Sequence, residues 1–264
     1  MDKNINHSLN SFPDHTTLPD SDNCHANNFQ GHFQSILLTD SIYSALQKIH
    51  PDGQYIIGQD CGIYWRKASP LEQGAESPDW FYVPDIPVKL DDQMRRFYVL
   101  WQELKPPLII LEFAIGDGSE EHDRTSLPQT SDSIKPGKFW VYEQIIKAPY
   151  YGIYNIREPD LIVYQLTNNS YQKITVNNRG HFPITELGVE LGLWEGAYQN
   201  QSRVWLRWWN NQGVLLLTGA EKAQRAEQAC KNSIVHLRKM GLTIENIAEA
   251  FALPIEVIQN YDES

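Results

Sequence analysis

The sequence is poor in cysteine, in long apolar runs and in positive charge. Its three cysteines, Cys24, Cys61 and Cys230, are scattered and form no C-x-x-C pair, which excludes a disulfide framework and a zinc site built on paired cysteines. No run approaches the roughly 18 apolar residues that a membrane span needs. The polar start, Met1-Asp2, lacks the apolar core of a signal peptide. These absences predict a cytoplasmic protein with no membrane partner.

Acidic residues outnumber basic ones by 33 to 22, which gives a formal net charge of −11. A surface of this sign opposes non-specific coating of nucleic acid, which depends on basic residues. It leaves room for a local basic groove or a metal-dependent site. The sequence also contains no G-x-S-x-G elbow, no H-E-x-x-H and no glycine-rich phosphate loop, so a small-molecule hydrolase is the least favoured interpretation.

Composition and periodicity divide the 264 residues into three parts. Residues 1–34 are rich in Asn, Ser, Asp and His, which predicts a disordered tail. Residues 35–218 alternate between strand and helix patterns and predict one domain. In residues 219–264 apolar side chains recur at steps of three and four, which predicts a helical arm able to form a coiled coil and a homodimer. It comprises a helix over 220–240 and two short helices over 242–251 and 254–261, with Thr243 as a cap. The end of this arm resembles a helix-turn-helix, but its few basic residues favour packing or dimerisation over groove binding.

Short patterns of both kinds fill the middle part. They first predict a helix over 39–50, with Thr39 or Asp40 as its cap. In chain order there follow a hairpin over 55–65, strands over 80–83 and 108–114, a helix over 138–146, strands over 151–156 and 161–166, a hairpin over 168–180, and strand pieces over 187–194, 204–206 and 214–217.

One stretch, Pro106 to Thr125, combines a buried strand with acidic residues. Its first part is a short apolar run rich in branched residues and bounded by prolines and glycine, the pattern of a central strand. A single carboxylate, Glu112, lies inside the run, where an unpaired charge is costly unless it is paired or binds a metal. An acidic loop follows and adds oxygen ligands. The stretch predicts a divalent-metal site, with a solvent-facing glutamate as the alternative.

Further polar residues line up around this strand. Asp79 precedes a short aromatic strand, Asp123 lies in the acidic loop, and Lys138 begins a helix that carries Tyr142 on the same face. Mg²⁺ takes oxygen ligands, usually one or two carboxylates plus a substrate phosphate, and such a metal activates water for phosphodiester cleavage. A nearby ammonium can offset the developing charge. The structural alternatives are Asp79 as a turn cap, Lys138 as a solvated residue and Tyr142 as a core residue.

In order and spacing these residues resemble the Uma-type restriction endonucleases, a branch of the PD-(D/E)XK nuclease superfamily. The resemblance implies a restriction endonuclease-like fold of the α+β or α/β class, a mixed β-sheet flanked by helices, with DNA as partner. It also implies Mg²⁺ or Mn²⁺ held by Asp79 and Glu112, with Asp123 as a contributor to the site. It rests on Ser77-Pro78-Asp79, the strand from Pro107 to Glu112, the loop to Asp123 and Lys138-x-x-x-Tyr142, and extends over residues 36–218.

One position departs from the superfamily pattern. The superfamily places a lysine two residues after the strand glutamate, where this sequence has Ala114. Lys138 is the candidate replacement and the third candidate catalytic residue. The same departure supports an alternative function, a catalytically inactive nuclease fold that serves as an interaction module with a dimerising coiled-coil arm.

Overall fold

The computed structural model describes residues 29–90, 92–127 and 135–262. The chain divides into two compact units, each built from separate segments. Of the described residues, the first comprises those within 29–35, 55–175 and 195–205, and the second comprises those within 36–54, 176–194 and 206–262. The tail predicted over 1–34 lies outside the described residues, except for 29–34, which belong to a helix.

Helix α1 (Phe29–Ile49) begins ten residues before its predicted start. Thr39 or Asp40 was expected to cap the helix, but both residues lie inside it. The reason is that the apolar face continues upstream of Thr39, where Leu37 and Leu38 are fully buried along with Ile42. Burial of this longer stripe stabilises the additional turns.

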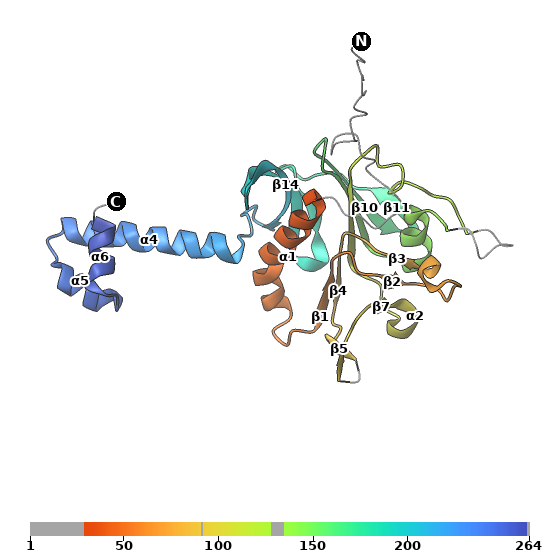
Figure 1. The fold of residues 1–264 in the computed structure, drawn as a ribbon. Coiled ribbons are helices and arrows are strands. Elements are labelled where there is room, and N and C mark those ends of the chain that lie inside the picture. Colours follow the sequence, from red (N-terminus) through yellow and green to blue (C-terminus); the bar gives the residue numbers. More distant parts are fainter. Residues whose placement is uncertain (1–28, 91, 128–134, 263–264) are drawn as a thin grey trace, which may run out of the picture. The chain divides into compact units, whose positions relative to one another are not determined.

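A six-stranded mixed sheet forms the centre of the first unit, in the order β1-β4-β8-β9-β10-β11. Of these strands, β1, β4, β10 and β11 are labelled in Figure 1. Neighbours β8 and β9 are parallel, and the other neighbouring pairs are antiparallel. The predicted central strand is confirmed, since all residues of β8 are buried. The strands are β1 (Tyr55–Gly58), β4 (Trp80–Pro84), β8 (Ile109–Ala114), β9 (Tyr150–Asn155), β10 (Asp160–Thr167) and β11 (Ser170–Lys173).

The predicted hairpin over 55–65 is wrong. Its two strands exist, but β1 pairs with β4, whereas β2 (Ile63–Tyr64) pairs with β3 (Ala75–Glu76) and β7 (Tyr98–Val99) in a separate sheet. Asp60 has a left-handed backbone, with φ of 50°, and directs the chain away from β1. Short elements connect these strands along the chain. Between β2 and β3 lies η1 (Leu71–Gly74), between β4 and β7 lies the hairpin of β5 (Lys89–Leu90) and β6 (Gln93–Met94), and between β7 and β8 lies α2 (Leu100–Glu103).

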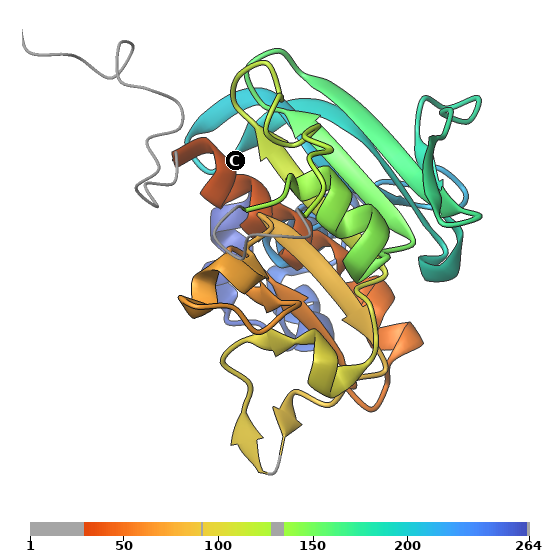
Figure 2. The ribbon, with the colours of Figure 1, turned by 90° about the vertical axis from the view of Figure 1, so that its right-hand side faces the viewer.

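The predicted helix over 138–146 is confirmed, and it packs on one face of the central sheet (Figure 2). It begins as α3 (Lys138–Trp140) and widens into a π-helical turn, η2 (Val141–Ile146). Phe139 and Tyr142 share a buried cluster with Ile110 of β8. This packing brings the polar residues of the helix toward the centre of the sheet.

A three-stranded sheet in the order β12-β13-β14 follows. It contains β12 (Phe182–Ile184), β13 (Val189–Tyr198) and β14 (Gln201–Asn210), with η3 (Thr185–Leu187) between the first two. The strand predicted over 214–217 is wrong. Leu215 of this run forms an isolated bridge to Trp209. The pairing does not extend into a strand, because the run leads directly into Thr218, the cap of the next helix.

The last three helices are confirmed as predicted: α4 (Gly219–Lys239), α5 (Ile244–Phe251) and α6 (Ile255–Asp262) (Figure 1). Thr218 and Glu221 form a reciprocal capping box at the start of α4. Ile234 of α4 shares a small buried core with Ile247 and Ile258 of the two short helices. No helix in the described ranges combines the length and apolar content that crossing a bilayer requires.

Candidate functional site

Glu112 stands on the face of the central sheet that the helix over 138–146 covers. Side chains alternate along a strand, so Glu112 shares a face with Ile110 and Ala114, both members of the buried cluster under that helix. Only 2% of Glu112 is exposed. A carboxylate buried to this degree requires compensating partners.

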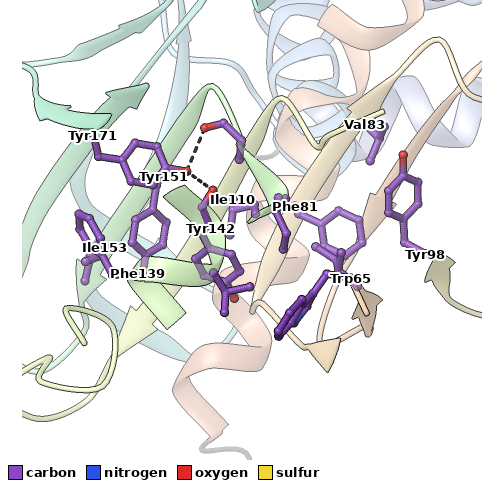
Figure 3. Close-up of a cluster of buried hydrophobic side chains, with 14 of the residues drawn as sticks. Trp65, Phe81, Val83, Tyr98, Ile110, Phe139, Tyr142, Tyr151, Ile153 and Tyr171 are labelled. Carbon is purple, nitrogen blue, oxygen red and sulfur yellow. Dashed lines mark hydrogen bonds between the residues drawn. The ribbon is translucent and has the colours of Figure 1, made fainter. Parts of the chain in front are cut away.

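Two partners reach Glu112 from the helix. The Tyr142 hydroxyl donates a hydrogen bond to Oε1 at 2.6 Å, and Lys138 Nζ lies 3.4 Å from Oε2. Since the two residues are one helical turn apart, a single helix face delivers both. Tyr142 is itself held by aromatic packing against Tyr151, with ring centroids 5.0 Å apart (Figure 3). Ala114 is buried, and Lys138 supplies the ammonium beside Glu112.

Asp79 lies beside Glu112 on the neighbouring strand. Trp80 of β4 pairs with Leu111 of β8, so the antiparallel register places the preceding residue, Asp79, opposite Glu112. Its Oδ2 accepts a hydrogen bond from the backbone N–H of Phe113 at 2.6 Å. Burial, and then the charge of Glu112, raise the pKa of Asp79 well above its usual range. The two carboxylates therefore repel each other, and a cation between them would relieve that repulsion.

Lys138 is surrounded by carboxylates. Its Nζ lies 3.2 Å from Glu120 and 3.9 Å from Glu121, in addition to its contact with Glu112. Burial by itself would lower the pKa of Lys138, but Glu112, Glu120, Glu121 and Asp79 outweigh it and raise this pKa. The ammonium is consequently charged at neutral pH. The sequence predicted the acidic loop here but showed no role for Glu120 and Glu121. In sequence, a loop carboxylate that forms an ion pair looks the same as one that faces water.

The structure does not bring Asp123 into this group. Its exposed carboxylate accepts hydrogen bonds from the backbone N–H and the hydroxyl of Thr125, at 2.8 and 2.6 Å. These bonds lower the pKa of Asp123. Asp123 acts as a local turn residue, which spacing along the sequence cannot distinguish from a ligand.

Glu76 is a further acidic residue that sequence reasoning missed. Only 1% of it is exposed, and its close polar neighbour among the described residues is Lys135, with Nζ 3.1 Å from Oε2. Burial raises the pKa of Glu76 to about 7, although Lys135 opposes this, and the charge of Glu112 adds to the rise. No local pattern marks Glu76, because its burial results from strand pairing between β2 and β3.

The side chains available as metal ligands limit which ion the site can bind. Among the described residues, no group of three or more His, Cys, Asp or Glu side chains is arranged to hold a metal ion. The site offers the pair Asp79 and Glu112, and Mg²⁺ is commonly bound by one or two carboxylates with water and phosphate as its other ligands. The residues present fit a metal of that kind.

The bond from Tyr142 to Glu112 predicts a measurable contribution to stability. Burial, and then Glu112, raise the pKa of Tyr142 well above its usual range, so the hydroxyl keeps its proton and donates. Tyr142→Phe is expected to lower the free energy of unfolding by about 1.5–3 kcal/mol, because it removes a donor to a buried charge. Urea unfolding measures this loss.

Tyr154→Phe is the matched control for that variant. Tyr154 is also fully buried, but its hydroxyl donates to a neutral acceptor, the Val204 carbonyl, at 2.8 Å. Its loss is expected to cost about 0.5–1.5 kcal/mol. Equal losses in the two variants would show that Glu112 does not depend on Tyr142.

The chain matches the model of a known family. Residues 26–200 match the family model of Uma2, described as "Putative restriction endonuclease". The matched range contains Asp79, Glu112, Lys138 and Tyr142. Comparison with curated proteins gives no match. The family match spans 175 of the 264 residues, and the chain, with its restriction endonuclease-like fold, therefore belongs to the Uma2 family.

Proposed function

We propose that the protein is a metal-dependent endonuclease that hydrolyses phosphodiester bonds of DNA, with Mg²⁺ or Mn²⁺ held by Asp79 and Glu112. The observation that carries this proposal is the placement of these two carboxylates opposite each other on neighbouring strands, with the Lys138 ammonium 3.4 Å from Glu112. Membership of a restriction endonuclease family supports the same chemistry. Such a bound cation polarises the phosphate and acidifies a water molecule.

The chain's own residues divide the remaining work. Lys138 is protonated, so it cannot accept a proton from the attacking water; it offsets negative charge on the phosphate. Glu120 and Glu121 hold the Lys138 side chain in place through its ammonium. Tyr142 fixes the orientation of Glu112 through their hydrogen bond. In the reaction the water oxygen bonds to phosphorus, and the bond from phosphorus to the leaving sugar oxygen breaks. The attacking water gives up a proton to the solvent, and the leaving oxygen takes one up from the solvent.

Metal binding gives the direct test. Calorimetric titration with Mn²⁺ is expected to show binding to the wild type, and Asp79→Asn is expected to weaken it by at least about 10–100-fold, the scale seen when even a residue supporting a metal ligand is removed. Asp117→Asn is the control, because this carboxylate is exposed in the loop and bonds to Ser119. Plasmid nicking with Mg²⁺ and with Mn²⁺ is measured alongside.

The alternative function is a catalytically inactive interaction module that dimerises through α4. Two observations favour it: Ala114 replaces the superfamily lysine, and no group of three metal ligands occurs in the described part of the chain. Absence of both Mn²⁺ binding and nicking would select this alternative. Analytical ultracentrifugation of the whole chain, compared with a chain ending at residue 218, would then test whether the arm forms dimers.

A further inference from the structure

The loop that follows β8 is held firmly at the edge of the candidate site. The Tyr151 hydroxyl donates to the Glu121 carbonyl at 2.9 Å, and Asn155 Nδ2 donates to the Gly116 carbonyl at 3.0 Å. Within the loop, the His122 N–H bonds to the Gly118 carbonyl at 3.0 Å. Glu121 pairs with Lys138, so the residues that follow it emerge directly beside the site.

Those residues bring two basic side chains onto an aromatic surface. The His122 ring meets Tyr164 edge-on, with centroids 6.3 Å apart, and the Arg124 guanidinium lies over the Phe139 ring at 3.7 Å. Tyr164 of β10 pairs in register with Lys173 of β11. The loop and the last hairpin of the sheet thus meet around Tyr164.

Three basic groups gather at this point. His122 contacts the Tyr164 ring, and Lys173 stands opposite Tyr164 on the neighbouring strand, where directly paired residues share a face of the sheet. Burial lowers the pKa of His122, and the charges of Arg124 and Lys173 lower it further. We call His122, Arg124 and Lys173 the basic strip. Arg124 is 56% exposed, and within the described ranges its ion-pair partner is Glu143, at 3.7 Å. Lys173 is exposed, and the described contacts contain no ion pair for it.

The strip contrasts with the rest of the chain. A protein of net charge −11 repels polyanions at long range, so a polyanion must engage local cations. Here the cations lie beside aromatic rings, the combination that binds phosphates and stacks bases. His122 and Arg124 share the loop of Glu120 and Glu121, which hold Lys138, and this places them next to the carboxylates proposed to bind metal. Lys173 lies on β11, opposite Tyr164.

We propose that the basic strip binds the phosphate backbone of a nucleic acid and presents it to the site of Asp79 and Glu112. This inference rests on the proposed nuclease function and adds where its substrate lies. Phosphates bridge Arg124 and Lys173, and the protonated fraction of His122 contributes at lower pH. Arg124 keeps its stacking on Phe139 while its exposed N–H groups face the ligand.

Fluorescence anisotropy of a labelled DNA duplex, in EDTA and over a range of salt concentrations, tests the strip without any cleavage. The logarithm of the affinity falls linearly with the logarithm of the salt concentration, and each lost phosphate contact makes this slope shallower by about 0.9. Arg124→Ala/Lys173→Ala is therefore expected to make the slope shallower by about 2 and to weaken binding at low salt by about tenfold or more. Lys173→Glu is the second variant: the side chain is exposed and has no ion pair with the part of the chain that the structure describes, so its charge can be reversed without disturbing the fold.

Lys222→Ala/Arg225→Ala is the matched control, since it removes the same charge from exposed positions on α4 and should leave the slope unchanged. Equal effects of the two double variants, or duplex binding unaffected by either strip variant, would overturn the proposal, as would a wild type that binds no duplex. If the strip variants lost binding to phosphatidylserine vesicles but kept duplex binding, the strip would be assigned to a lipid surface instead. If the strip variants weaken duplex binding, but the wild type neither binds Mn²⁺ nor nicks DNA, the strip proposal stands and the nuclease function is rejected.

Discussion

Replacing Glu112 with glutamine is expected to lower metal-dependent nicking by about 10³-fold or more, because loss of a single preorganised electrostatic group typically costs 10²–10³ in rate and this change also removes a proposed metal ligand. Glutamine keeps the shape of the side chain, and its carbonyl oxygen still accepts the Tyr142 hydrogen bond. Its amide cannot replace the negative charge beside Asp79 and Lys138. The effect should therefore fall on metal binding and rate rather than on folding.

The fold of the Glu112→Gln variant can be judged from the partners that remain. Lys138 keeps Glu120 at 3.2 Å and Glu121 at 3.9 Å, so its ammonium is not left unpaired. Circular dichroism and urea unfolding should show a fold close to that of the wild type. Calorimetry with Mn²⁺ should show weakened binding in parallel with the loss of nicking.

Glu190→Gln is the control for this experiment. Glu190 is also buried and paired, with Arg179 and with His181 at 3.0 Å, but it belongs to the second unit. Its variant is expected to lose stability while keeping nicking activity. Wild-type nicking in Glu112→Gln would remove Glu112 from the mechanism, and equal loss in both variants would indicate damage to the fold.

The second large effect concerns the pH dependence of stability and comes from Glu76. Its folded pKa of about 7 lies above the usual value of 4.5, so the folded protein holds this proton more tightly than the unfolded chain. For a raised carboxyl pKa, the stabilisation is present at low pH and is lost as pH rises from about 4.5 to about 7, a change of about 3 kcal/mol. Glu76→Gln is always neutral and should lack this contribution.

The difference in unfolding free energy between Glu76→Gln and the wild type is the quantity to measure, by urea unfolding at several values between about pH 5 and pH 8. As the pH rises across that range, the free energy of unfolding of the variant should rise by about 3 kcal/mol relative to that of the wild type. Other groups titrate as well, but the difference cancels those that the substitution leaves unchanged. Parallel curves for the two proteins would show that Glu76 is not perturbed.

Lys135→Met supplies an independent check on the same group. Lys135 lowers the pKa of Glu76, so its removal should raise that pKa further and extend the pH-dependent loss of stability to higher pH. Lys135 is itself 51% exposed, and its replacement should otherwise have a small effect. A shift toward lower pH would contradict the assigned ion pair.

Local patterns were sufficient for the elements that carry the site. The apolar run with branched residues, bounded by prolines and glycine, predicted β8, because such runs are typical of strands buried on both faces of a sheet. The burial of Glu112 was one of two alternatives, and the packing of the helix on β8 decided it. The spacing of Lys138 and Tyr142 specified a shared helix face, since 3.6 residues complete a turn. Thr243 as the cap of α5 and the apolar periodicity of α4 followed in the same way from neighbouring residues.

Pairing between distant segments was not determined by these patterns. The sequence predicted that β1 and β2 pair with each other, but each found a partner elsewhere, because adjacent strands separated by a flexible turn can enter different sheets. The start of α1 was also misplaced, because Thr39 has the residue type of a cap while the apolar face extends beyond it. In both cases tertiary burial overrode a local signal.

The sequence by itself determined the residue types of the site and the elements on which most of them stand. Only the tertiary structure decided which of them meet. The register of β4 on β8 places Asp79 opposite Glu112, the packing of the helix brings Lys138 to Glu112, and Thr125 holds Asp123 in a local turn. Burial of Glu76 and the gathering of the basic strip likewise depend on segments far apart in the chain. The physical reason is that secondary structure follows from neighbours in sequence, whereas charge compensation and burial follow from neighbours in space.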